Sequence, residues 1–159
     1  MTVSQIKSRK EIEYVKSALA VLNIEYATPA HAEADFRSKE NRIYALKKDN
    51  VPVAICSIVP DKVFHYDAVK RLVVLDPSKK GNGYAKRLVR TIINRRSANY
   101  GCTPWEDNEP MKKLLTSLGF VYQYNFNQVW TFWKKSAGII CTTLLDVNRL
   151  TGEALVIHG

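Results

Sequence analysis

The chain has 159 residues, with 24 Lys or Arg against 15 Asp or Glu, which gives a formal net charge of +9. This length allows one domain that buries roughly two thirds of its unfolded surface without disulfides or metals. No apolar run approaches the ~18 residues of a membrane span, and no charged-then-apolar leader follows Met1, so we expect a cytoplasmic protein without a membrane partner. The three cysteines have neither disulfide-framework nor zinc spacing and are expected to be reduced and buried: Cys56, Cys102 and Cys141.

The first forty residues predict a short strand followed by two helices. Residues 2–6 alternate weakly, as in an edge strand. Ser8 and Glu11 have the spacing of a capping box, which opens a helix. Thr28-Pro29 begins a second, shorter helix with Phe36 as its anchor. The first helix is expected to bury Ile12, Val15, Leu19 and Leu22.

An antiparallel hairpin is predicted next. The apolar-rich runs 43–46 and 51–59 are separated by turn residues at 48–50, and Pro60-Asp61 ends the second run. The segment 63–66 then leads into a strand at 68–75, because four consecutive apolar residues with β-branched Val73 and Val74 are typical of a buried strand. That strand stops at Asp76-Pro77, since proline cannot donate to a sheet ladder.

A basic loop with two glycines connects this strand to a helix that runs to about residue 97. Gly81 and Gly83 lack β-carbons, so a ligand can approach their backbone closely, and the first N–H groups of the helix point outward without partners. The segment therefore predicts a phosphate cradle. Asn82-Gly83 is also a hairpin signal, but the following 3.6-residue period favours a helix. Its apolar face comprises Ala85, Leu88, Val89, Ile92 and Ile93.

Most of the excess positive charge lies around this loop. Between Lys62 and Arg96 there are ten Lys or Arg residues against only Asp67 and Asp76. A focused basic field attracts an anionic partner, and both a polyphosphate cofactor and a nucleic acid meet that description. A solvated helix face explains the same pattern without any ligand.

The remaining sequence predicts one more helix among strands. A short strand covers 99–103, and a helix with Leu114 and Leu115 on its apolar face ends at Gly119 in a left-handed conformation. Aromatic-rich strands follow at 120–126 and 128–133, and a last hairpin joins 139–145 to 154–157. We therefore predict a mixed α/β (α+β) fold with a mostly antiparallel sheet of about seven strands, one parallel crossover and about four helices, plus a C-terminal hairpin extension at 138–159.

Two motifs in this order resemble the GNAT superfamily of acyl-CoA-dependent N-acetyltransferases. The cofactor motif of that family, Arg/Gln-x-x-Gly-x-Gly/Ala, is matched from Lys80 to Ala85. The second motif, an Asn, a helix and then Gly-Phe opening the next strand, is matched by Asn108 and by Gly119-Phe120. The resemblance covers about residues 43–135, and we expect the chain to form a single GNAT-like domain, 1–159.

The resemblance implies acetyl-CoA as the acyl donor, with direct attack of an amine on its thioester in a ternary complex. In such proteins the amides of the glycine loop bind the CoA pyrophosphate, the preceding strand pairs with the pantetheine arm, and the motif asparagine lies near the thioester. The cofactor-binding residues that this implies are Leu72, Val73, Val74, Leu75, Lys80, Gly81, Asn82, Gly83, Tyr84, Ala85 and Asn108.

The sequence departs from the family pattern at two positions. Lys80 replaces the usual Arg or Gln and can contact phosphate without a bidentate fork. Leu115 occupies the position where the family often has a tyrosine as general acid. Another tyrosine or water must then protonate the thiolate, and Tyr122 is our candidate beside Tyr100 and Tyr124. The alternative interpretation, a packed strand residue, is the commoner one for each of these three tyrosines.

For the general base, Asp67 or His65 lies just before the central strand, close to where relatives carry a glutamate. A surface turn residue is the alternative interpretation. Cys102 as an acyl-carrying nucleophile is disfavoured, because no paired histidine is evident.

The acceptor stays open among a small amine, a protein and an aminoacyl-tRNA or other nucleic acid. Tryptophans that could stack on bases favour the last class, although aromatic residues in strands are commonly core: Trp105, Trp130 and Trp133. An alternative function is a non-catalytic GNAT-like module that binds CoA or nucleic acid. The C-terminal hairpin could pair with that of a second copy, which makes a homodimer plausible.

Overall fold

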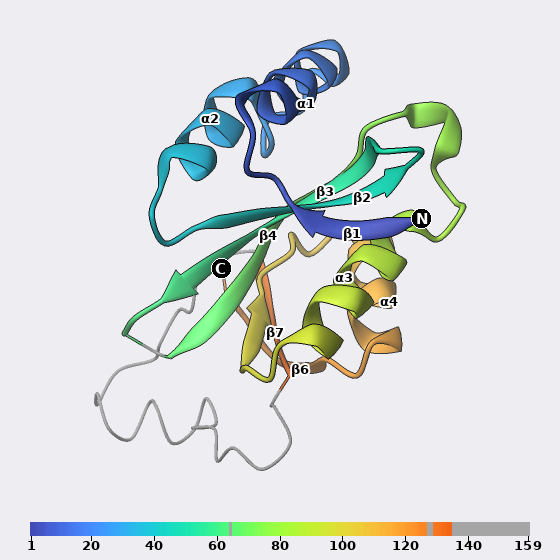
Figure 1. The fold of residues 1–159 in the computed structure, drawn as a ribbon. Helices are drawn as coiled ribbons and strands as arrows, with labels where there is room; N and C mark the ends of the chain where they lie inside the picture. Colours follow the sequence, from blue (N-terminus) through green and yellow to red (C-terminus); the bar gives the residue numbers. More distant parts are fainter. Residues whose placement is uncertain (64, 127–128, 135–159) are drawn as a thin grey trace. The chain divides into compact units, whose positions relative to one another are not determined.

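The computed structural model describes residues 1–63, 65–126 and 129–134. The chain divides into two compact units. Most of their helices and strands are labelled in Figure 1. The first unit comprises Met1–Pro60 and Val69–Arg96, and the second comprises Asp61–Ala68 and the residues from Ser97 onward. Strand β4 (Tyr66–Val74) begins in the second unit and continues into the first.

The first unit contains a four-stranded sheet with the order β1-β2-β3-β4. Strand β1 pairs with β2 in antiparallel register, with Val3 opposite Leu46, and β2 pairs with β3 in the same sense. The elements of this unit, apart from β4, are β1 (Thr2–Gln5), α1 (Arg9–Leu22), α2 (Pro29–Arg37), β2 (Arg42–Lys48), β3 (Val51–Asp61), the 3-10 turn η1 (Pro77–Lys79) and α3 (Tyr84–Arg95).

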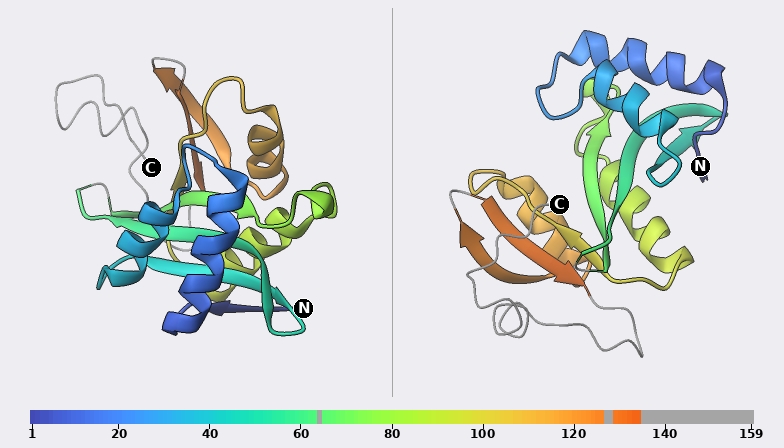
Figure 2. Two further views of the ribbon diagram at one scale, coloured as in Figure 1. Left: turned by 90° about the horizontal axis from the view of Figure 1, so that it is seen from above. Right: turned by 90° about the vertical axis from the view of Figure 1, so that its left-hand side faces the viewer.

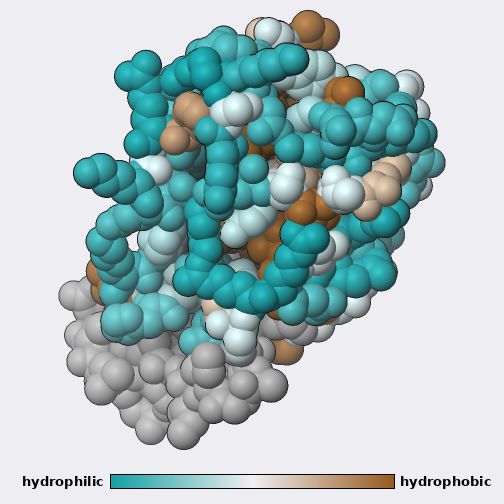
Figure 3. All heavy atoms as spheres, in the orientation of Figure 1, coloured by the Kyte–Doolittle hydropathy of each residue, from teal (hydrophilic) through white to brown (hydrophobic). Residues whose placement is uncertain are grey.

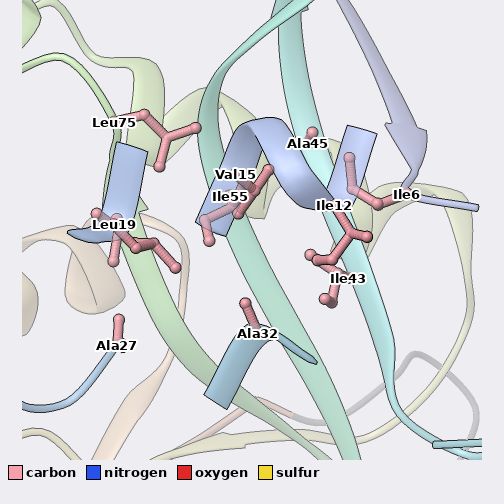
Figure 4. Packing of buried hydrophobic residues seen from close by; sticks show 11 residues of the cluster. Ile6, Ile12, Val15, Leu19, Ala27, Ala32, Ile43, Ala45, Ile55 and Leu75 are labelled. Atoms are coloured by element: carbon pink, nitrogen blue, oxygen red, sulfur yellow. The ribbon is translucent and has the colours of Figure 1, made fainter. Parts of the chain in front are cut away.

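Helices α1 and α2 cover one face of this sheet and α3 the other (Figures 1 and 2). The apolar stripe of α1 points at the strands, so that Ile12, Val15 and Leu19 pack with Ile43, Ala45 and Ile55 in one buried cluster (Figure 4). Burial of each large aliphatic side chain contributes about 1.5–3 kcal/mol. Three of the four core positions predicted for α1 are confirmed, whereas Leu22, at the end of the helix, is only half-buried.

Helix caps follow the predicted pattern in part. Ser8 Oγ accepts a hydrogen bond from the N–H of Glu11 at 3.1 Å, as predicted, but the hydroxyl also donates to Glu11 Oε1. The reciprocal capping box lies instead at the start of α2, where Thr28 Oγ1 accepts from the His31 N–H and His31 Nδ1 accepts from the Thr28 N–H, both at 3.1 Å. It was missed because His replaces the usual Glu or Gln.

Helix α2 is anchored by Phe36, as predicted, and also by two buried residues. Phe36 packs against the core cluster but stays partly exposed. The buried residues of the helix are Ala32 and Asp35. A carboxylate therefore occupies an inward position in α2, and buried charges require partners.

The second unit contains the first residues of β4 together with three further strands. Their order in the sheet is β4-β5-β7-β6. The pairing of β4 with β5 is parallel and places Asp67 opposite Tyr100. The pairings of β5 with β7 and of β7 with β6 are antiparallel. Helix α4 contacts β6. The elements are β5 (Tyr100–Cys102), α4 (Glu109–Ser117), β6 (Val121–Phe126) and β7 (Val129–Lys134).

The predicted fold class is confirmed: the described residues form seven strands, one parallel strand pair and four α-helices. Element ends differ by a few residues. Strand β3 runs through Pro60 to Asp61, where the sequence predicted a stop, and α3 ends at Arg95 rather than near residue 97. The hairpin predicted beyond residue 138 lies outside the described residues.

Hydrophilic residues predominate on the face shown in Figure 3. Among the described helices, none has both the length and the apolar character to cross a bilayer.

Candidate cofactor-binding site

The loop after β4 is held by hydrogen bonds of its own. Asp76 Oδ1 accepts from the N–H of Ser78 at 3.0 Å and from its hydroxyl at 2.7 Å, which caps η1. These hydrogen bonds hold the pKa of Asp76 below its usual range. Just before the loop, the Leu75 N–H donates to the carbonyl of Val53 at 2.9 Å and ties the end of β4 to β3. The chain therefore reaches Lys80 in a fixed direction.

Two glycines of the loop adopt left-handed backbone conformations. Gly81 has φ +85° and Gly83 has φ +76°. For a residue with a β-carbon such a conformation costs roughly 1–2 kcal/mol. A β-carbon added at either glycine would meet no described atom within 4 Å. The glycines are therefore required by the backbone path and not by crowding, and open space adjoins both of them.

The N-terminus of α3 is uncapped by any side chain. Gly83 is its N-cap residue, and the first helical hydrogen bond runs from the Arg87 N–H to the Gly83 carbonyl at 2.9 Å. The other described α-helices are each capped by a side chain, from Ser8, Thr28 and Asn108. The N–H groups of residues 84–86 thus remain available, and the helix dipole favours an anion at this end.

Basic side chains surround this N-terminus. Lys79 and Lys80 precede the glycines, and Lys86 and Arg87 lie in the first turn of α3, which contains no acidic residue. Helix α3 keeps them at the surface because its apolar stripe faces the sheet and buries Leu88, Val89 and Ile92. The predicted phosphate cradle therefore has open backbone donors, glycine geometry and positive charge in one place.

The strand that leads into the loop was predicted to be buried throughout, but its side chains alternate between buried and half-buried. Val73 and Leu75 are buried in the cluster beneath α1 and α2, whereas Leu72 and Val74 are half-buried. The pairing of β4 with β5 ends at Ala68, so residues 72–75 lie beyond the segment that pairs with β5.

One residue of β4 departs from strand geometry and was not predicted. Arg71 has φ +49° and forms an ion pair with Asp35 of α2. The sequence contained only a weak signal for this pair, because Arg71 directly precedes the apolar run 72–75 but Asp67 and Lys70 are charged residues of the same strand. The position of its partner, 36 residues earlier, could not be inferred from spacing.

A pocket of about 400 Å³ adjoins the start of the loop in the first unit. Its lining comes from α1, from the β2–β3 hairpin and from the residues after β4: Tyr14, Ala18, Lys48, Asp49, Val51, Pro52, Val53, Leu75, Asp76 and Lys79.

In the second unit, Asn108 is the N-cap of α4. Its Oδ1 accepts from the N–H of Met111 at 3.2 Å. This bond uses the amide oxygen and orients the Nδ2 donor. The helix ends at Ser117, and Gly119, two residues later, has a φ of +87°, which confirms the predicted left-handed residue.

Leu115, at the position where the family often has a tyrosine, is completely buried in α4. It serves the core of the second unit and offers no proton. Cys56 and Cys102 are buried and form no disulfide within the described part of the chain, as predicted, while Cys141 lies outside it.

The three catalytic candidates all belong to the second unit. Asp67 is buried in β4, and its backbone N–H donates to the carbonyl of Asn99 at 2.8 Å. His65 lies exposed in the turn before β4, and Tyr122 lies exposed on β6. Their roles stay predictions. Trp105, one of the proposed stacking residues, is 58% exposed.

Comparison with known proteins supports the motif-based resemblance. The family model described as the acetyltransferase (GNAT) family matches residues 12–120 of the chain. This range includes the glycine loop, Asn108 and Phe120. No curated protein matches the sequence.

Several solved acetyltransferases share the fold. An acetyltransferase from Thermus thermophilus has a TM-score of 0.66 and 12% identity, over 84% of this chain and 97% of that one. A mutant spermidine N-acetyltransferase from Vibrio cholerae has a TM-score of 0.63 and 10% identity, over 84% of this chain and 94% of that one. An aminoglycoside 6'-acetyltransferase type Ii has a TM-score of 0.65 and 14% identity, over 85% of this chain and 97% of that one. At these identities the likeness concerns the fold.

Proposed function

The chain belongs to the GNAT acetyltransferase family, and on that premise we propose that it transfers an acetyl group from acetyl-CoA to an amine by direct attack in a ternary complex. The observation that carries the proposal is the uncapped N-terminus of α3, reached through left-handed Gly81 and Gly83 and flanked by Lys79 and Lys80. It is suited to a pyrophosphate and has no evident structural use.

The residues around this site fit the CoA part of the donor. The amides that follow Gly83 would bind the pyrophosphate, and Lys80 would add a point charge where the family has Arg or Gln. Residues 72–74 of β4, together with Leu75 directly after it, would pair with the pantetheine arm. We also keep Asn108 as a cofactor contact through Nδ2, by resemblance to the family motif.

The reaction forms a C–N bond to the amine and breaks the C–S bond of the thioester. The amine must lose a proton, and we assign its removal to Asp67 or His65, which would act as the general base. The departing thiolate must gain one, and Tyr122 is the proposed donor because buried Leu115 cannot serve. Acetyl-CoA supplies the activated acyl group, and the protein supplies orientation and proton transfer.

The acceptor is proposed from charge. Two structures of the same fold are named as acetyltransferases of spermidine and of aminoglycosides, which are polycationic amines. A chain with a net charge of +9 repels such acceptors at long range. A neutral small amine, or an amine on an anionic molecule such as an aminoacyl-tRNA, suits this chain better.

The proposal is tested by incubation of the protein with isotopically labelled acetyl-CoA and a panel of small amines, peptides, aminoacyl-tRNA and DNA, followed by mass spectrometry. Label on one acceptor, and none with Gly83→Glu, supports the transferase. Transfer to no acceptor by a protein that binds CoA favours the second candidate, a non-catalytic CoA-binding module, for which buried Leu115 is the supporting observation.

A further inference from the structure

Arg71 is unusual among the described residues because its left-handed backbone lies inside a strand. The other non-glycine residues with positive φ lie in turns or at a helix end: Asn23, Asp49, Asn50 and His65. A residue with a β-carbon adopts this conformation only where its surroundings enforce it. Some interaction must therefore hold the backbone of Arg71 in this conformation.

The ion pair of Arg71 with Asp35 is that interaction. Arg71 Nε lies 2.6 Å from Asp35 Oδ2, and Arg71 Nη2 lies 2.7 Å from Oδ1, so that the guanidinium and carboxylate form a fork. Asp35 is 2% exposed, and the side chain of Arg71 is 19% exposed. A bidentate pair fixes direction as well as distance, and a buried one is hard to break.

Two further side chains donate hydrogen bonds to the carboxylate of Asp35. Ser57 Oγ donates to Asp35 Oδ2 at 2.7 Å, and Asn41 Nδ2 donates to Oδ1 at 3.0 Å. Burial alone raises the pKa of Asp35, but the hydrogen bonds from Arg71, Ser57 and Asn41 outweigh it and lower the pKa. Four donors occupy the carboxylate, so it is not available as a general base.

The position of Arg71 in β4 shows what the pair controls. Arg71 forms its ion pair with Asp35 of α2, so its side chain points to the face of the sheet that α1 and α2 cover. Val73 and Leu75 belong to the cluster beneath α1 and α2. Because an irregular residue bends a strand locally, a change of backbone conformation at residue 71 would redirect the residues that follow it up to the glycine loop.

We propose that Asp35 and Arg71 form a positioning pair, which holds the left-handed backbone of β4 at Arg71 and thereby sets the path of residues 72–75 into the glycine loop. The inference rests on the proposed function, because those residues are the ones assigned to the pantetheine arm. Asp35 and Arg71 act through the backbone of β4 and not by contact with the reacting atoms.

Two double variants separate this role from a merely stabilising ion pair. Asp35→Asn/Arg71→Gly and Asp35→Asn/Arg71→Ala both remove the pair, but glycine adopts the left-handed conformation without strain and alanine does not. We expect the glycine variant to bind CoA almost as tightly as the wild type in calorimetry. The alanine variant should bind about tenfold more weakly, which corresponds to the cost of a left-handed residue. Equal affinities of the two variants would overturn the proposal.

A ligand-free measurement distinguishes failure of this inference from failure of the proposed function. If the wild type binds no CoA, the proposed function is wrong, and amide hydrogen exchange at residues 72–75 decides the inference alone. Faster exchange in the alanine variant than in the glycine variant supports it, and equal exchange refutes it. If either double variant fails to melt cooperatively, Arg71→Lys replaces both, since it keeps the charge without the fork. Faster exchange than in the wild type at residues 72–75 is then expected, and unchanged exchange contradicts the inference.

Discussion

Asp76 accepts two hydrogen bonds from Ser78, one from its backbone N–H and one from its hydroxyl, and so closes the turn that opens the glycine loop. The loop is therefore shaped by the protein itself. Preorganised backbone donors bind an anion without the cost of ordering the loop at the moment of binding.

Asp76→Ala removes this cap and should weaken CoA binding about fivefold, because the loop must then be ordered on binding. Asp76→Asn is the matched control, since its amide oxygen still accepts from Ser78. Calorimetry on both variants checks the expectation. A loss of affinity of the same size in the asparagine variant would point to the charge of Asp76 and not to its cap.

Gly83→Glu should abolish CoA binding, because it places a carboxylate at the proposed phosphate position and a β-carbon on a left-handed residue. Gly83→Ala carries the same backbone strain without the charge, and nothing described lies within 4 Å of its β-carbon. We therefore expect the alanine variant to bind more weakly than the wild type but measurably. Equal affinity of Gly83→Glu and Gly83→Ala would exclude an anion at this position.

Asp35→Asn should destabilise the protein by ~3–5 kcal/mol near neutral pH, since Arg71 would keep its buried guanidinium without a counter-charge. The pKa of Asp35 is lowered in the folded state, so its contribution is fully present above the ordinary aspartate pKa of about 3.9 and is lost as the pH falls through the lowered value.

Urea unfolding of the wild type and of Asp35→Asn between pH 7 and strongly acid pH measures this contribution. The difference between the two free energies of unfolding should shrink as the solution is acidified. Other carboxylates with lowered pKa values, such as Glu11 beside Lys47, titrate in both proteins and cancel in the comparison. A difference that stays constant down to acid pH would contradict the assignment.

Gly101→Ala should destabilise the second unit by ~1–3 kcal/mol, the usual cost of overpacking. A β-carbon at Gly101 would lie 2.6 Å from Cε2 of the Tyr66 ring, and Tyr66 is itself buried. Thermal melting measures the effect. The double variant Tyr66→Leu/Gly101→Ala is the control: it should lose less stability than the two single variants add up to, and strict additivity would show that the ring is not the obstacle.

The parts of the site that sequence predicted are those with local signals. The apolar strand, the glycine loop and the apolar stripe of α3 are each encoded within a few consecutive residues, and all three are present in the structure. The strand ends at Val74, one residue before the predicted end, and Ala85 and Ile93 of the predicted stripe are only half-buried. Gly119 was predicted for the same reason, because a left-handed helix end is a local event.

What sequence could not provide depends on contacts between distant residues. The pair of Asp35 with Arg71 joins a helix to a strand 36 residues away, and no periodicity encodes that distance. The burial of Lys112 in α4 was missed for a different reason, because its partner is local: its ammonium lies 2.7 Å from Oε1 of Glu109, one helical turn earlier. The ion pair accommodates a side chain that composition assigns to the surface.

Binding of the acetyl-CoA pyrophosphate by the N-terminus of α3 and its glycine loop is tested by calorimetric titration of acetyl-CoA into the wild-type protein, with Gly83→Glu as the reference. We predict saturable binding of one molecule per chain with micromolar-scale affinity, absent in the variant. No binding of acetyl-CoA to a folded wild type would contradict it.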